Sequence, residues 1–132
     1  MKQVLRVDWV APPGNKFQRL HGQQQTKIAR EAYHTITVEC LRQGIVPLEE
    51  EHYPIRLTLA VYFGKGVRSY DWVNLWPTAK IIEDGLRKAR IKGRPVLAED
   101  SRKFVEYGTM IPRIDRSSPF SYSILTITSN TL

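Results

Sequence analysis

Five acidic side chains are set in a strongly basic part of this 132-residue chain. Between Lys65 and Lys103 the sequence holds ten basic residues and five acids, a difference of ten minus five that supplies +5 of the total charge of +7. Carboxylates are oxygen ligands for hard cations such as Mg²⁺, and a surrounding excess of lysine and arginine attracts phosphate. A nuclease has this double requirement, because it must hold a metal ion and still bind a polyanion.

The acids are spaced so that they could meet at one end of a sheet. Asp71 precedes a predicted helix, Asp84 lies on it, and Glu99 and Asp100 follow it, while Lys80 is one helical turn from Asp84. In phosphodiester hydrolysis a bound cation lowers the pKa of the attacking water, and a nearby lysine neutralises charge on the phosphoryl oxygens. Paired acids are also common on surface loops that have no catalytic role. Composition alone therefore leaves two interpretations open, a nuclease site and an ordinary solvated surface.

A run of cations extends from the end of this predicted helix into a loop, and it consists of Arg87, Lys88, Arg90, Lys92 and Arg94. We expect the run, together with Lys65, Arg68 and Asn74, to contact nucleic acid. The structural alternative is a helix C-terminus whose cations complement the macrodipole. Trp72 and Trp76 flank the acidic segment, where they would stack on unpaired bases, fill a subunit interface or lie in the core.

Several other kinds of site are excluded or disfavoured. The single cysteine, Cys40, rules out a disulfide framework and a zinc site of paired thiolates, and it lies on the apolar side of a predicted helix, where burial is expected. The three histidines share no metal-ligand spacing, and no glycine-rich loop for a nucleotide cofactor is present. No apolar run has the length of a membrane span, and the N-terminal stretch is no signal peptide, so we expect a cytoplasmic protein.

The elements that must position these residues are predicted to form one domain over residues 1–132. Alternating apolar residues predict strands at 5–9, 55–63, 103–111 and 122–128, and three- and four-residue spacing predicts helices at 24–43 and 78–89. Gly44 is expected to cap the first helix and Pro77 to begin the second. The order predicts an α+β fold, with a single mixed, mostly antiparallel β-sheet and two main helices packed on it.

The order of the motifs resembles the RusA family of Holliday-junction resolvases and related phage endodeoxyribonucleases. The family pattern is Asp-x-Asp-Asn-Leu, a lysine, Asp-x-Leu and an acidic pair. This chain has Asp71-Trp72-Val73-Asn74-Leu75, then Lys80, then Asp84-Gly85-Leu86, and then Glu99-Asp100. Residues 9–15, Trp-Val-Ala-Pro-Pro-Gly-Asn, are similar to the opening strand and Pro-Pro-x-Asn turn of that family.

The resemblance implies a small homodimeric enzyme, of bacterial or phage type, that cuts four-way DNA junctions in recombination and repair with Mg²⁺, or with Mn²⁺ in its place. It implies that Asp71 and Asp100 are metal carboxylates, that Glu99 is a neighbouring ligand, and that Lys80 is the charge-stabilising lysine. Lys80 follows the motif later than in the family, so residues 76–78 are interpreted as an insertion. Val73 replaces the second aspartate, so the site binds one metal, recruits Glu99 or Asp84, or is inactive.

Three functions are therefore weighed. The sequence favours a structure-specific, Mg²⁺-dependent endodeoxyribonuclease. The first alternative is a catalytically impaired DNA-junction-binding protein of the same fold, because valine cannot ligate a cation. The second alternative is a basic RNA-binding or ribosome-associated domain, which would be favoured if the acids are scattered in space. Carboxyl groups of Asp71 and Asp100 within reach of one cation would favour the nuclease.

Overall fold

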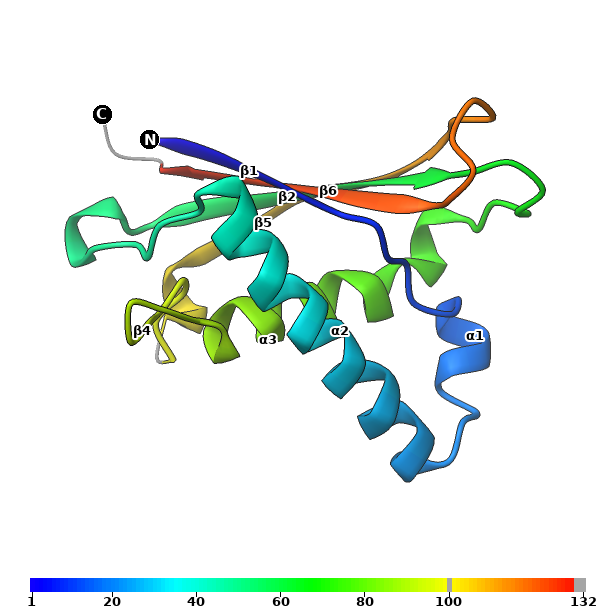
Figure 1. The fold of residues 1–132 in the computed structure, drawn as a ribbon, viewed down its shortest axis with the longest axis horizontal. Coiled ribbons are helices and arrows are strands. Elements are labelled where there is room, and N and C mark those ends of the chain that lie inside the picture. The colour runs from blue at the N-terminus through cyan, green and yellow to red at the C-terminus, as the bar shows by residue number, and fades with distance from the viewer. Residues whose placement is uncertain (100, 130–132) are drawn as a thin grey trace.

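A four-stranded mixed sheet has all of its helices on one side (Figure 1). The structure is a computed structural model that describes residues 1–99 and 101–129. The strands of the main sheet are β1 (Lys2–Val7), β2 (Ile55–Phe63), β5 (Val105–Ile114) and β6 (Tyr122–Ser129). The α-helices are α1 (Gly14–Phe17), α2 (Gly22–Gln43) and α3 (Trp76–Lys88). A small hairpin of β3 (Arg90–Ile91) and β4 (Arg94–Pro95) and the short 3-10 helices η1 (Glu50–His52), η2 (Trp72–Asn74) and η3 (Arg102–Phe104) complete the described elements.

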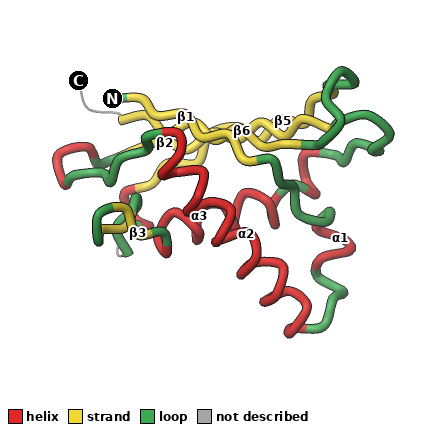
Figure 2. Tube along the Cα trace, viewed as in Figure 1, coloured by secondary structure: helices red, strands yellow, loops and turns green. Residues whose placement is uncertain are grey.

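The strand order is β1-β6-β2-β5, which confirms the predicted α+β class with a mixed, mostly antiparallel sheet. β6 runs antiparallel to both β1 and β2, whereas β2 and β5 run parallel. A parallel pair needs a crossover connection, and the chain between β2 and β5 supplies one by passing through α3 (Figure 2). The crossover therefore carries the whole acidic and basic segment across one face of the sheet.

A bulge interrupts β5 where it pairs with β2. The register steps from Leu57 opposite Tyr107 to Leu59 opposite Met110. Gly108 lies in the bulge, and a Cβ there would be only 2.4 Å from Cγ2 of Thr58. Glycine at this point leaves room for the side chain of Thr58 on the neighbouring strand.

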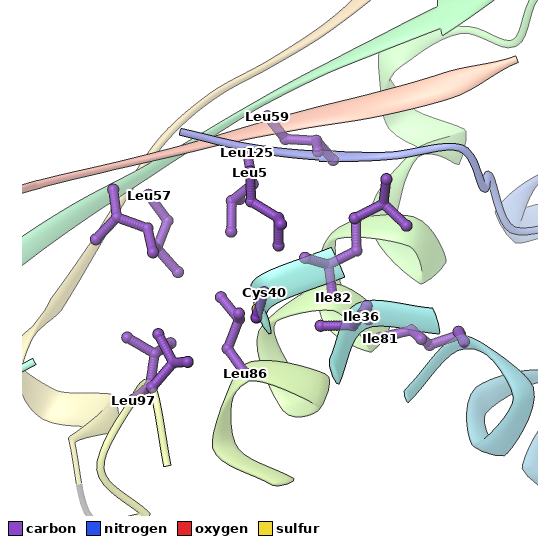
Figure 3. Packing of buried hydrophobic residues seen from close by; sticks show 14 of the residues in the cluster. Leu5, Ile36, Cys40, Leu57, Leu59, Ile81, Ile82, Leu86, Leu97 and Leu125 are labelled. Atoms are coloured by element: carbon purple, nitrogen blue, oxygen red, sulfur yellow. The ribbon is translucent and has the colours of Figure 1, made fainter. Parts of the chain in front are cut away.

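The core lies between the sheet and the two long helices (Figure 3). Leu5, Leu59 and Leu125 point from three strands toward Ile36 of α2 and Ile82 of α3. Cys40 also lies in this core, as predicted, and burial raises the pKa of its thiol to about 12. A Cβ on Gly85 would lie 2.6 Å from Cδ1 of Ile36, so this glycine allows α2 and α3 to pack in close contact.

The cap of α2 and the start of α3 agree with the sequence-based prediction, whereas the short elements were not predicted. Gly44 caps α2 in the left-handed conformation (φ 71°), and Pro77 stands in the first turn of α3, as predicted. The first strand ends at Val7, so Trp9 lies outside it, and the Pro-Pro-Gly segment that follows leads into α1. β5 begins and ends later than predicted, at Val105 and Ile114. In the described residues, no helix has the length and apolar character needed to cross a bilayer.

Candidate active site

Asp71 lies at the beginning of the crossover helix. It directly precedes η2, and its carbonyl oxygen accepts a hydrogen bond from the backbone N–H of Asn74 at 2.9 Å. The side chain borders a shallow hollow of about 410 Å³, whose lining comes from α1, the segment after β2 and η2. The lining residues are Pro13, Asn15, Lys16, Arg68, Ser69, Tyr70, Asp71 and Asn74.

The N-terminal Pro-Pro-Gly-Asn segment forms one wall of this hollow. The backbone N–H of Asn15 donates to Oδ1 of Asn74 at 3.2 Å, and the N–H of Ala11 donates to Oγ1 of Thr78 at 3.0 Å. Gly14 packs against the indole of Trp76 so closely that a Cβ would lie 2.1 Å from its Nε1. The predicted DNA contact of Asn74 therefore competes with a structural bond, because its amide oxygen already joins η2 to α1.

Asp71 is an exposed acid with cations beside it. Its carboxylate makes no ion pair with any residue in the described ranges 1–99 and 101–129, although Lys16 and Arg68 line the same hollow. Both cations are exposed to solvent. The hollow therefore offers free carboxylate oxygens to a cation and two positive side chains to a phosphate.

A second hollow, of about 320 Å³, lies near the C-terminal end of α3 and is lined by Asp84, Arg87, Lys88, Glu99 and Arg102. Nζ of Lys80 lies 3.2 Å from Oδ2 of Asp84, as expected for residues one turn apart, and Nη2 of Arg102 lies 3.2 Å from Oδ1 of the same carboxylate. Nη2 of Arg90 lies 3.3 Å from Oε1 of Glu99. The acids in this hollow are therefore neutralised by neighbouring cations.

The structure does not bring Asp71 and Glu99 together. Asp71 precedes the first turn of α3, whereas Glu99 pairs with Arg90, which follows the C-cap residue of α3. A helix of 13 residues is about 20 Å long, while oxygens that share one Mg²⁺ each lie about 2.1 Å from it. Asp100 lies outside the described residues. Among those described, no three Asp, Glu, His or Cys side chains gather closely enough to hold a metal ion.

The basic run after α3 is largely paired with acids. Arg90 contacts Glu99, and Arg94 makes two hydrogen bonds to Glu49, at 2.9 and 3.0 Å. The ammonium of Lys88 lies 5.5 Å from the ring centroid of Tyr33. Lys92 is exposed at the turn of the β3–β4 hairpin, with a positive φ of 53°. Within the described residues, only Lys88 and Lys92 of the five cations lack an acid partner, so the predicted DNA-binding strip keeps two unpaired charges.

Arg87 departs most from its predicted role, because only 6% of its surface is exposed. Its Nη1 donates to Oε2 of the equally buried Glu83, and its Nε donates to the carbonyl oxygen of Ala98 at 3.3 Å. Nη2 donates to Oγ of Ser101 at 3.4 Å. Arg87 thus holds the chain on both sides of residues 99 and 100 and does not face a DNA backbone.

Tyr107, which is 60% exposed, bonds to the buried Arg87–Glu83 pair from its solvent side, and the spacing of the motifs did not predict this contact. Its hydroxyl donates to Oε2 of Glu83 at 2.9 Å, and burial together with this bond raises the pKa of the phenol. A signal was available, since Glu83 and Arg87 are four residues apart on the same helix, next to apolar positions. Buried charges are normally paired, so that spacing predicts an internal ion pair better than it predicts a DNA contact.

Two loops at the same end as Asp71 carry further exposed cations. The segment after β2 contains Lys65 and Arg68, and the segment between β5 and β6 contains Arg116, whose Nη1 donates to the carbonyl oxygens of Gly64 (2.6 Å) and Val67 (2.7 Å). Figure 1 shows the two loops together at one end of the sheet, with the β3–β4 hairpin at the other. The predicted contacts Lys65 and Arg68 are therefore separated from the run at 87–94.

Comparisons with protein-family models and with curated proteins found no match to this chain. The resemblance to RusA-type nucleases therefore rests on the motif residues themselves.

Proposed function

We propose that this protein is a structure-specific endodeoxyribonuclease that cuts branched DNA, including Holliday junctions, by Mg²⁺-dependent phosphodiester hydrolysis. The observation that carries the proposal is the hollow at the start of α3, where the exposed carboxylate of Asp71 lies beside Lys16 and Arg68. We further propose a cytoplasmic setting and a role in DNA recombination and repair, in line with the RusA-like motifs.

The residues of this hollow fit a magnesium ion that is shared with the substrate. Mg²⁺ keeps several waters and is commonly bound by one or two carboxylates together with substrate phosphates, so one free carboxylate suffices to begin such a site. The ion would supply a water of lowered pKa and neutralise the leaving oxygen. Asp71 would hold it, while Lys16 and Arg68 would bind the flanking phosphates and orient the scissile one.

Lys80 keeps its proposed role as the charge-stabilising lysine if a phosphate of the substrate can replace Asp84 as its partner. Its ammonium is paired with Asp84 at 3.2 Å, and 60% of the lysine side chain is exposed. The Asp84 side chain is only 18% exposed and also pairs with Arg102, so its charge stays compensated if Lys80 turns to a phosphate. Lys80 is therefore available to DNA although it is paired in the free protein.

A specific observation favours the alternative, a DNA-junction-binding protein with impaired turnover. Val73 stands in η2 where the family pattern has an acid, and Glu99, which was expected to compensate, lies at the other end of α3. In that case the hollow would bind phosphates and hold the ion weakly. The two functions share the DNA surface and differ only in the rate of cleavage.

The homodimer belongs to the proposal, and we assign its interface to the sheet face that the helices leave uncovered (Figure 2). Val4, Ala60 and Ile124 on this face come from three different strands, and Tyr62 stacks on Tyr122 at its end. Each of the three aliphatic side chains keeps some exposure to solvent. A second copy of the chain would cover them, and light scattering during gel filtration measures whether the mass is that of two chains.

A cleavage assay tests the nuclease. A labelled four-way junction is incubated with the protein and Mg²⁺, with EDTA as one control and a linear duplex of the same sequence as the other. The proposal requires cuts near the branch point in Mg²⁺ and none in EDTA or on the duplex. Tight junction binding without cutting in Mg²⁺ or Mn²⁺ would establish the alternative instead, and no preference for the junction would exclude both.

A further inference from the structure

Trp72 is an exposed aromatic residue with no structural role visible in the core. It is the first residue of η2, directly after Asp71, and 63% of its surface is open to solvent. Trp76, one turn further along, packs edge-on against Phe17 with ring centroids 5.8 Å apart. Large exposed apolar side chains beside polar surface commonly mark a binding site, so Trp72 needs an explanation that Trp76 does not.

Two loops, residues 64–70 and 115–121, lie at the same end of the sheet as Trp72 and bind each other. The backbone N–H of Lys65 donates to the carbonyl oxygen of Ser118 at 2.9 Å, and Arg116 binds two carbonyls of the first loop. Gly64 touches the backbone of Phe120, where a Cβ would lie 2.6 Å from the carbonyl carbon. These contacts fix the loops to each other before any ligand arrives, which lowers the ordering cost of binding.

The second of these loops also carries an exposed aromatic residue. Phe120, on the second loop, is also 63% exposed. We call residues 64–74 and 115–121 the loop end. It carries the cations Lys65, Arg68 and Arg116 and the acids Asp71 and Asp115.

One of the two acids of the loop end is already engaged. The carboxylate of Asp115 accepts hydrogen bonds from the hydroxyl of Ser117 at 2.5 Å and from that of Tyr122 at 2.6 Å, and these bonds lower its pKa. Lys16 adds a further cation at the hollow that Asp71 borders. Hydroxyl donors leave the Asp115 carboxylate charged, so the loop end and Lys16 together hold four cations and two acids. This surface is net positive and presents aromatic rings among its cations.

This combination selects one kind of ligand. Single-stranded nucleic acid is bound by cations that track the backbone and by aromatic side chains on which unpaired bases stack. Within paired DNA the base faces are covered by their neighbours, so an exposed indole gains little from an intact duplex. We propose that the loop end binds single-stranded DNA, with Trp72 stacking on an unpaired base and Arg68 and Lys65 holding adjacent phosphates.

The choice of DNA rests on the proposed function, and the inference deepens it. Bases at a branch point are more easily unpaired than those in a continuous duplex, and Trp72 is the neighbour of the proposed metal ligand Asp71. A base held on Trp72 would therefore set which phosphate reaches the hollow. Trp72 would act as a specificity-determining residue for opened DNA.

The test measures binding in EDTA, so that it does not depend on cleavage. The affinity of a labelled twelve-nucleotide oligomer of deoxythymidylate is measured by fluorescence anisotropy for the parent protein, Trp72→Ala and Trp72→Phe. Stacking on one base corresponds to roughly a 5- to 150-fold loss in affinity for the alanine variant, and phenylalanine should restore most of it. Phe104→Ala is the matched control, because Phe104 is 46% exposed but lies in η3, away from the loop end, and its removal should change nothing.

Quenching of tryptophan fluorescence gives a second readout. The oligomer should quench emission of the parent protein and should not quench Trp72→Ala, in which Trp9 and Trp76 remain. Equal affinity of Trp72→Ala and the parent would overturn the inference, as would an equal loss on a blunt duplex or tighter binding of a uridylate oligomer of the same length. If the protein binds thymidylate through Trp72 but never cuts junctions, this inference stands and the proposed nuclease activity is excluded. If it cuts junctions but Trp72 does not contribute to thymidylate binding, the nuclease stands and this inference is excluded.

Discussion

The two ends of α3 both combine acids with cations, yet they differ in how the charges are paired. At the N-terminal end, Asp71 and Arg68 line one hollow without forming an ion pair. At the C-terminal end, Arg87, Arg90 and Arg94 each contact an acid. Pairing in space therefore reduces the five cations of the C-terminal run to two without an acid partner, the same number that Lys16 and Arg68 place around the free carboxylate of Asp71.

Burial divides the C-terminal end further. The Arg94–Glu49 pair has about half of each side chain exposed, and pairs of that kind contribute between 0 and 1 kcal/mol. The Arg87–Glu83 pair is buried, so removing one partner leaves an uncompensated charge inside the protein. One end of the helix is thus suited to recognition, and the other mainly holds the chain in place.

The largest expected effect concerns which end carries the chemistry. Asp71→Asn should lower the single-turnover rate of junction cleavage by at least about 100-fold, the scale of losing one electrostatic contact to the transition state, while binding stays equal or tightens because a negative charge is removed. Glu99→Gln, the matched change at the other end, should keep a rate within a few-fold of the parent. The opposite ranking would move the proposed metal site to the hollow of Asp84 and Glu99.

The next effect concerns stability at the C-terminal end. Arg87→Ala should lower the free energy of unfolding by about 3 to 5 kcal/mol, because Glu83 loses its buried partner, and urea denaturation measures the loss. Arg94→Ala removes an exposed pair and should cost less than about 1 kcal/mol. Equal costs for the two variants would show that burial does not separate these pairs.

Salt dependence compares the cations of the two ends directly. Each phosphate contact adds about 0.9 to the slope of log affinity against log salt concentration. Replacing Lys16 and Arg68 together by Gln should therefore flatten the slope for a DNA junction by roughly 1.8. Replacing Lys88 and Lys92 by Gln tests the strip that the sequence predicts. A larger flattening there than at Lys16 and Arg68 would restore the original assignment.

The smallest effect on the fold is expected at Val73. Because 56% of this residue is exposed in η2, Val73→Asp should change the free energy of unfolding by less than about 1 kcal/mol. If position 73 lies beside the metal held by Asp71, the new carboxylate should lower the Mg²⁺ concentration for half-maximal cleavage and raise the rate. Thermal melting and a metal titration measure the two quantities, and a stable variant without either gain would remove Val73 from the site.

The long elements follow from the sequence because their signals are local. β2 has the predicted bounds, and α2 has the predicted end at Gly44, since period-two alternation and a helix-capping glycine are each decided within a few residues. α1 and the β3–β4 hairpin were missed because short elements of this kind depend on contacts made elsewhere in the fold. Gly14 of α1, for example, is set against Trp76, more than sixty residues away.

The site was only partly predictable for the same reason. Lys80 and Asp84 are close because they share a helix, and their pairing follows from spacing alone. The separation of Asp71 from Glu99 depends on where the chain runs after α3, and the backbone N–H of Leu97 bonds to the carbonyl oxygen of Leu86 there, near the far end of the helix. Nothing in the spacing of the acids specifies that return point.

The bulge in β5 also affects how the protein behaves in concentrated solution. β5 is an outer strand of the main sheet, and such strands offer free backbone groups with which neighbouring molecules can form ribbons. Here the bulge at Gly108 breaks the regular hydrogen-bonding pattern, and Pro112, four residues further on, lacks an N–H. A long uninterrupted ladder is therefore disfavoured at the β5 edge, and strand-to-strand association at high concentration should proceed through the other outer strand, β1.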